Sequence, residues 1–332
     1  MLAVSTQFLS DEPVGRSSWL PTLLGFGGVG YELCDHTPRD RFSELIDAFR
    51  RQGRPVVSLR NYCPVPRGLT PGLTAAKALS LIAPDTEHRA RSIAATEETL
   101  EWAARAEAPC VIIDVGPCGM PPPADKIETL VRQRKWEGPE GDHARAYFAK
   151  QRQPHAARAV DTLLRSLDHV LQRAEQLEIA VAVRNPLAYD HLPLTSEFEL
   201  LLREFRGSRL RTWYDVGHAR ARESLGLESA LELRHSMGAR GRAGERGDGP
   251  SALAGYHLTD VRGYRVGLLP GEGEIDFRIP LDGASPEIPM VVLAPRGTAP
   301  EKIAEALGFI RSLGLDGPPP QPWEDHLPII GR

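Results

Sequence analysis

Short apolar runs alternate along this chain with longer runs that have helical periodicity. Most of the short runs are apolar throughout, as expected of strands buried on both faces of a parallel sheet. The predicted strands are 2–5, 30–33, 56–59, 110–114, 179–183, 210–214, 253–258 and 290–293. The predicted helices are 38–51, 86–106, 156–177, 196–205, 223–235 and 300–313. Eight strands that alternate with helices in this way favour a (β/α)8 TIM barrel, in a single domain spanning 1–316.

A doubly wound open sheet is the structural alternative to the barrel. It would be favoured by a glycine-rich phosphate-binding turn directly after the first strand. The glycine-rich stretch of this chain, 25–30, leads into a strand instead of following one, so a tight loop is the better interpretation. We therefore expect a closed barrel, in which the carboxyl ends of the strands meet at one rim.

Three segments are expected to lie outside the barrel. Segment 117–154 is long, polar and proline-bearing, and it follows the fourth strand, so it is either a lid over the rim or a surface excursion with an extra helix. Segment 238–250 has low complexity and is predicted to be a mobile loop. The tail 317–332 is expected to pack across the outside or to be disordered.

Composition narrows the classes of function. The net charge of −4 gives no indication of nucleic-acid or anionic-membrane binding. The four cysteines form no CxxC pair, which is typical of reduced thiols in a cytoplasmic protein. The N-terminal stretch is a poor signal peptide, and no apolar run approaches the ~18 residues that a membrane span needs.

Polar side chains stand where several apolar runs end. Asp215 closes the run before Val216-Gly217-His218, and His257 stands near the end of the run that begins at 253. Asp114 ends the fourth run, and Arg184 directly follows the fifth. Because the carboxyl ends of barrel strands converge, these side chains and Ala294, after the eighth strand, are predicted to lie at one end of the barrel.

Three motifs stand in a specific order: DVGHA at 215–219, HLTD at 257–260 and LPGEGEIDF at 269–277. Support comes from GYEL at 30–33 and from the helical run 89–106 that leads into CVIIDVG. With these motifs the chain, from about residue 2 to residue 313, resembles the xylose isomerase-like TIM-barrel superfamily. That superfamily includes sugar and sugar-phosphate isomerases and epimerases, dehydratases and endonuclease IV.

The resemblance implies a divalent metal held by a Glu ending strand five, the Asp of the D-x-G-H motif, the His of strand seven and a Glu ending strand eight. The Asp and the His correspond to Asp215 and His257, whereas the two glutamates are replaced by Arg184 and Ala294. The standard metal site is therefore expected to be lost. The further ligands of the endonuclease IV relatives are replaced as well, by Arg60 or Asn61, Asp114, Arg265 and Gly267, so nuclease activity is not expected.

Arg184 offers a physical reason for these losses. A guanidinium pairs with a carboxylate without any metal and repels a divalent ion. We therefore expect no cofactor, and a direct or bridged contact between Arg184 and Asp215. Two alternatives stay open: that Asp215 and His257 are only satisfied polar residues inherited from a metal-binding ancestor, or that manganese, magnesium or zinc is bound by a shifted set of ligands. The shifted set would consist of Asp114, Asp215, His218 and His257, with Glu32 in reach.

The functional hypothesis is a sugar isomerase- or epimerase-like barrel that binds a small polar or anionic molecule at the rim. If it is an enzyme, an isomerase, epimerase or lyase of a sugar-like substrate is expected. The candidate catalytic residues are His257 or His218 as base, Asp215, and Arg184 as electrostatic stabiliser. The candidate substrate-binding residues are Arg60, Asp114, Asn185, Arg296 and Glu32. The alternative is a non-catalytic binding or scaffold protein, with a protein partner or as a homo-oligomer.

Overall fold

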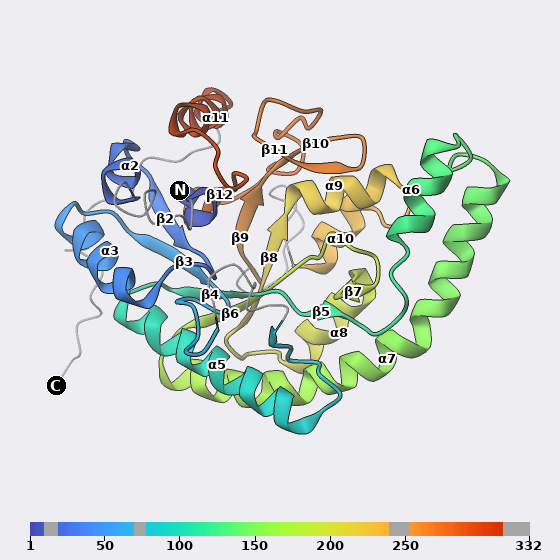
Figure 1. Ribbon diagram of the computed structural model, residues 1–332, viewed down its shortest axis with the longest axis horizontal. Coiled ribbons are helices and arrows are strands. Elements are labelled where there is room, and N and C mark those ends of the chain that lie inside the picture. Colours follow the sequence, from blue (N-terminus) through green and yellow to red (C-terminus); the bar gives the residue numbers. More distant parts are fainter. Residues whose placement is uncertain (10–18, 70–77, 239–251, 315–332) are drawn as a thin grey trace.

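Eight parallel strands close into a barrel in the computed structural model, which describes residues 1–9, 19–69, 78–238 and 252–314 (Figure 1). Around the barrel the strands follow the order β1-β12-β9-β8-β6-β4-β3-β2. Their bounds are β1 Leu2–Ser5, β2 Gly30–Leu33, β3 Val56–Arg60, β4 Cys110–Ile113, β6 Ala180–Arg184, β8 Leu210–Asp215, β9 Leu253–Leu258 and β12 Met290–Val292. The predicted TIM barrel is confirmed, and each predicted strand agrees with the observed one to within one residue at either end.

Alternation along the strands decides which side chains enter the barrel. Successive residues of a strand point to opposite faces, so every second residue faces the interior. The interior apolar cluster consists of Ala3, Val57, Cys110, Ile112, Ala182, Trp213, Val291 and Leu293. Two residues beyond Ile112, Ala182 and Trp213 come Asp114, Arg184 and Asp215, which therefore also face inward, at the carboxyl end.

Helices cover the outside of the barrel. They are η1 Thr6–Phe8 (a 3-10 turn), α2 Trp19–Gly25, α3 Arg39–Arg51, α5 Thr86–Arg105, α6 Ala124–Arg132, α7 Pro139–Gln176, α8 Thr195–Glu204, α9 Val216–Ser224, α10 Ala230–Ser236 and α11 Pro300–Ser312. In the described part of the chain no helix is both long and apolar enough to cross a membrane.

Two of the helix predictions were wrong in extent. The helix predicted at 156–177 begins at Pro139, because the chain tolerates Pro154 inside the helix. The helix predicted at 223–235 is two helices, α9 and α10. They are separated by a turn in which Gly226 adopts φ 63°, and the hydroxyl of Ser229 caps the second helix by accepting from the backbone N–H of Glu232.

Segment 117–154 forms a helical hairpin from α6 and the first part of α7. It has its own small apolar cluster around Trp136 and Phe148, and the indole N–H of Trp136 donates to the carbonyl of Leu225 at 3.1 Å. In Figure 1 this hairpin projects beyond the barrel, and a short antiparallel pair, β5 Gly116–Pro117 with β7 His191–Leu192, lies at its base. Its role as a lid stays a prediction. The predicted mobile loop, apart from Gly238, and the tail lie outside the described residues.

The crossover from β9 to β12 is built differently from the others. After β9 come two antiparallel strands, β10 Asp260–Arg262 and β11 Arg265–Leu268, and then only turns up to β12. Every residue from 252 to 314 is described, and this crossover contains no helix. The helix layer is therefore interrupted beside α9 and α10.

Asp260 explains why the HLTD and LPGEGEIDF motifs occur together. Its carboxylate accepts four backbone N–H bonds, from Val261, Gly271, Gly273 and Ile275, at 2.8 to 3.1 Å. A Cβ on Gly273 would lie 2.4 Å from this carboxylate, so a glycine is required there. The side chain of Glu272 accepts from the backbone N–H of Leu269 at 3.1 Å. These motif carboxylates therefore shape a loop.

Candidate functional site

Arg184 lies at the centre of the polar cluster inside the barrel mouth. Its Nε and Nη2 donate to the two oxygens of Asp114 at 2.7 and 2.9 Å. Its Nη1 donates to Oδ2 of Asp215 at 3.3 Å and to Nδ1 of His257 at 3.2 Å. The side chain is 9% exposed. The predicted contact between Arg184 and Asp215 is confirmed, and Asp114 is an additional, closer partner.

His257 is held between Arg184 and Glu32. A guanidinium only donates, so Nδ1 of His257 accepts from Arg184 and the ring proton resides on Nε2. That nitrogen donates to Oε2 of Glu32 at 2.6 Å. Glu32 also accepts from the hydroxyls of Ser5 and Ser58, at 2.8 and 3.2 Å. Both nitrogens of His257 are therefore engaged in the interior, and its side chain is fully buried.

Asp215 ends β8 and caps α9. Its Oδ1 accepts from the backbone N–H of His218 at 3.0 Å. The side chain of Asn185 bonds to the backbone of Asp215 twice: its oxygen accepts from the N–H at 2.6 Å, and its NH₂ group donates to the carbonyl at 3.0 Å. The backbone carbonyl of Asn185 accepts from Nδ1 of His218 at 3.0 Å. Because Nδ1 carries the proton, Nε2 of His218 retains its lone pair, 3.6 Å from Oδ2 of Asp215.

The charges of the cluster shift several pKa values. Burial lowers the pKa of His218 to about 4, with the nearby charge of Arg184 adding to the effect, so the imidazole is neutral at neutral pH. Burial alone would raise the pKa of Asp215, but His218 and Arg184 hold it below its usual value. The same balance, with Arg184 and Arg60 as the cations, keeps the pKa of Asp114 low.

Arg60 and Asp114 form the outer part of the cluster. Nη2 of Arg60 donates to Oδ2 of Asp114 at 3.2 Å, and Nη1 donates to the side-chain oxygen of Gln7. The Asp114 side chain is 31% exposed, more than that of Arg60 at 14%. Arg296 is exposed in the loop after β12. A ligand that enters the mouth would therefore meet Asp114, Arg60 and His218 before the deeper residues.

The polar residues at the strand ends were predicted from the sequence, whereas several of their hydrogen-bond partners were not. The prediction that Asp114, Arg184, Asp215, His257 and Ala294 lie at one end of the barrel is confirmed, because all follow or end parallel strands. The hydrogen-bond partners that were not predicted are Ser5, Gln7, Ser58 and Thr259. Ser5 and Ser58 stand on the two strands that flank β2, which carries Glu32. Ser5 lies two positions beyond the inward-facing Ala3, so strand alternation was the available signal for Ser5, but not for Ser58, which directly follows the inward-facing Val57.

A divalent metal does not fit this arrangement. A metal bound by His257 and Asp215 needs the lone pair of Nδ1 and an oxygen of the carboxylate, and Nη1 of Arg184 donates to both. The shifted ligand set fails for the same reason, since Arg184 also donates to both oxygens of Asp114. A cation placed among these groups would face the positive charge of Arg184 at close range.

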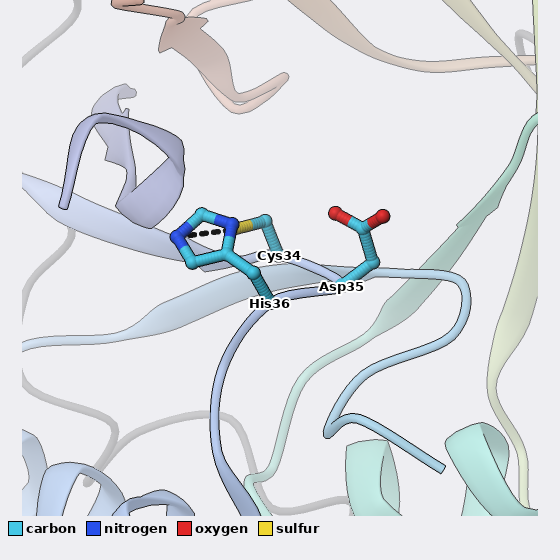
Figure 2. A group of neighbouring side chains, drawn as sticks. All are labelled: Cys34, Asp35 and His36. Atoms are coloured by element: carbon cyan, nitrogen blue, oxygen red, sulfur yellow. Dashed lines mark hydrogen bonds between the residues drawn. The ribbon is translucent and has the colours of Figure 1, made fainter. Parts of the chain in front are cut away.

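A second group of potential ligands lies beside the mouth, at Cys34, Asp35 and His36 (Figure 2). Sγ of Cys34 is 2.9 Å from Nδ1 of His36, whereas two ligands of one tetrahedral zinc are roughly 3.5 Å apart. Nε2 of His36 donates to the carbonyl of Thr6 at 3.1 Å, and burial raises the pKa of the Cys34 thiol to about 12. Figure 2 shows the carboxylate of Asp35 directed away from the imidazole. The group is therefore a thiol–imidazole hydrogen bond and not a metal site.

The sequence matches no known family model and no curated protein. Solved structures do match. The 3-keto-D-glucoside 4-epimerase of E. coli superposes with a TM-score of 0.63 at 15% identity, over 94% of this chain and 98% of that chain. An L-ribulose 3-epimerase superposes with a TM-score of 0.62 at 14% sequence identity, over 95% of this chain and 94% of that chain. A xylose isomerase domain protein from Planctomyces limnophilus superposes with a TM-score of 0.56 at 14% sequence identity, over 94% of this chain and 95% of that chain.

At these identities the likeness concerns the fold, and it covers nearly the whole of both chains in each comparison. The similar structures include several sugar epimerases, as the motifs around Asp215 and His257 led us to expect. The chain therefore has the fold of the xylose isomerase-like, sugar epimerase TIM barrels.

Proposed function

We propose that this barrel binds a small, neutral, sugar-like molecule at its carboxyl-end mouth, with the guanidinium of Arg184 in the place of a metal ion. The observation that carries the proposal is the set of four hydrogen bonds by which Arg184 joins Asp114, Asp215 and His257. Support for a sugar-like ligand comes from the similar structures, among them a D-psicose 3-epimerase in the presence of D-fructose.

The charges of the mouth favour a neutral ligand over an anionic one. Three carboxylates, Glu32, Asp114 and Asp215, face two guanidinium groups, Arg60 and Arg184, which leaves a net charge of −1 with both histidines neutral. Each arginine already has a carboxylate partner. An added anion would compete with these pairs, whereas hydroxyl groups can accept and donate beside Asp114 without displacing it.

His218 is the residue best placed to move a proton. Nε2 keeps a lone pair, the side chain is 16% exposed, and the lowered pKa keeps the ring neutral. A carbonyl of the ligand would be polarised by Arg60 or Arg184 while His218 takes the proton from the neighbouring carbon. His257 is fully buried, so we assign to it the positioning of Arg184.

Binding without catalysis is the second candidate function. It is favoured by the same pKa of about 4, because a general base works best when its pKa lies near the operating pH. A base this weak returns the proton readily and gives slow exchange at most. The two functions therefore differ in whether a bound sugar exchanges a carbon-bound proton with the solvent.

Proton exchange in D2O tests the proposal. The protein, treated with EDTA, is incubated with D-fructose, and deuterium at the carbons beside the carbonyl is followed by NMR. We expect saturable binding with slow incorporation of deuterium that is lost in His218→Gln and kept in the surface control Arg203→Gln, whose side chain is 65% exposed. Binding without exchange supports the non-catalytic function. Exchange that requires added Mn²⁺ contradicts the role of Arg184.

A further inference from the structure

A second cavity lies on the outside of the barrel, where the crossover from β9 to β12 lacks a helix. It has a volume of about 300 Å³ and is enclosed by α9, α10 and segment 274–280. Its wall includes Tyr214, which precedes Asp215 on β8. Consecutive residues of a strand point to opposite faces, so this cavity and the mouth are separated by the barrel wall. None of the residues assigned to the proposed function lines this cavity.

A buried cation that has no anionic partner among the described residues lines this cavity. Arg234 of α10 is 8% exposed, and its Nη2 donates to the backbone carbonyl of Asp282. Its Nε has no hydrogen-bond partner, and no carboxylate pairs with it among the residues that the structure describes. Burial raises the pKa of the Tyr214 and Tyr256 hydroxyls, and the nearby guanidinium of Arg234 opposes this rise at both. A buried charge without a counterion is costly, so an anion is the missing partner.

The acidic side chains at the rim are already engaged. Glu223 accepts from Arg220 at 2.6 Å and from the backbone N–H of Ala230 at 3.2 Å. Asp276 forms two hydrogen bonds with Arg278 at 2.8 Å, and Glu274 accepts from the backbone N–H of Gly263 at 3.1 Å. The charge of Arg234 is therefore left for a group that enters the cavity.

The rim also carries exposed apolar side chains. Leu231 is 58% exposed and Ile279 is 71% exposed, and both line the cavity. Together with Tyr147 and Leu187 they are the exposed large hydrophobic residues of the described chain, so two of the four lie at this opening. An apolar rim over a buried cation matches a ligand with one anionic end and a hydrocarbon body.

We propose that this cavity binds a small amphipathic monocarboxylate. The carboxylate pairs with the guanidinium of Arg234, and the hydrocarbon chain lies against Leu231 and Ile279. A planar carboxylate suits a guanidinium because two parallel hydrogen bonds form between them. The site exists because the missing crossover helix leaves α9 and α10 uncovered on this side.

Calorimetric titration with hexanoate tests the proposal, with hexanamide as the uncharged probe of the same length. We expect one saturable hexanoate site and at least tenfold weaker binding of hexanamide. A matched pair of rim variants, Leu231→Glu and Leu231→Lys, removes the same apolar contact and adds opposite charges. Hexanoate should bind at least fivefold more weakly to the Glu variant than to the Lys variant. Because Leu231 is exposed, both variants are expected to fold.

Arg234→Met tests the cation itself, and it should abolish the preference for hexanoate over hexanamide. His218→Gln, at the mouth, should leave hexanoate binding unchanged, which separates this site from the proposed function. The proposal is overturned if the wild-type protein shows no saturable hexanoate binding, if both probes bind equally, or if the two Leu231 variants behave alike. Loss of hexanoate binding in His218→Gln would place the ligand at the mouth and would also overturn it.

Discussion

Arg184 and Asp114 form a bidentate ion pair across neighbouring strands, in which Nε and Nη2 of the arginine lie 2.7 and 2.9 Å from the two carboxylate oxygens. The register explains why this pair is closer than Arg184 and Asp215. Ile113 of β4 pairs with Val183 of β6, so Asp114 and Arg184 are level with each other. On the other side Arg184 pairs with Trp213, so Asp215 stands two residues further along the barrel axis and meets Nη1 only. Strand order predicted the contact of Arg184 with Asp215, and register makes Asp114, which was not predicted as a partner, the main one.

Replacement of Arg184 by Met is expected to destabilise the fold strongly. The change removes the hydrogen bonds that Arg184 donates to Asp114, Asp215 and Nδ1 of His257, and removal of one partner of a buried ion pair costs about 3–5 kcal/mol. Urea unfolding followed by circular dichroism measures the loss in the free energy of unfolding. The exposed pair of Arg203 with Glu204 provides the control, since Arg203→Met should cost less than about 0.5 kcal/mol. A similar small cost for both variants would contradict the central role of Arg184.

A carboxylate at position 184 is expected to create a metal site. Arg184→Glu removes the positive charge, adds a ligand beside Asp114 and Asp215, and frees Nδ1 of His257. These oxygen and imidazole ligands suit Mn²⁺. The variant should gain thermal stability on addition of MnCl₂ and should bind close to one equivalent by elemental analysis.

Arg184→Gln is the matched control for the metal site, because it has nearly the same size as the Glu variant and lacks the charge. It and the wild-type protein should show no manganese-dependent stabilisation. Stoichiometric manganese in the wild-type protein would refute the idea that the guanidinium replaces a metal, whatever the behaviour of the variants.

The positions of the barrel strands could be predicted from the sequence, whereas many of the side-chain contacts in the site could not. Apolar runs locate buried strands well, and the residue after each run marks the rim, which is how Asp114, Arg184 and Asp215 were found. The tautomer of His257 and the engagement of Glu32 depend on contacts between strands 225 residues apart, and no local pattern encodes them. The break between α9 and α10 was missed because periodicity continues across Gly226 while its positive φ ends the helix.

His257 is predicted to carry its ring proton on Nε2. Nδ1 must accept from Arg184, and Nε2 donates to Glu32 at 2.6 Å. Two-dimensional ¹H–¹⁵N NMR that correlates ring protons with both ring nitrogens distinguishes the tautomers directly. Glu32→Gln should shift the His257 nitrogen resonances and cost about 1–3 kcal/mol, because the Gln NH₂ group cannot accept from Ser5, Ser58 or His257. A proton on Nδ1 in the wild-type protein would mean that the Arg184 contact is absent.

His218 is expected to make the protein less stable as the pH falls from about 6.5 to about 4. Its pKa is 6.5 in an ordinary environment and is lowered to about 4 in the folded chain, with burial as the main cause. Between these values the unfolded chain binds a proton that the folded chain does not, so the free energy of unfolding decreases as the pH falls through this window. The shift corresponds to a loss of at most about 3 kcal/mol. Urea unfolding of the wild-type protein and His218→Gln, from pH 7 to pH 4, measures this loss as the difference between the two curves of unfolding free energy against pH.

The variant His169→Gln, at an exposed histidine, serves as the control and should follow the wild-type curve. Identical pH dependence in the wild-type protein and His218→Gln would show that His218 is not the buried neutral base that the mouth requires.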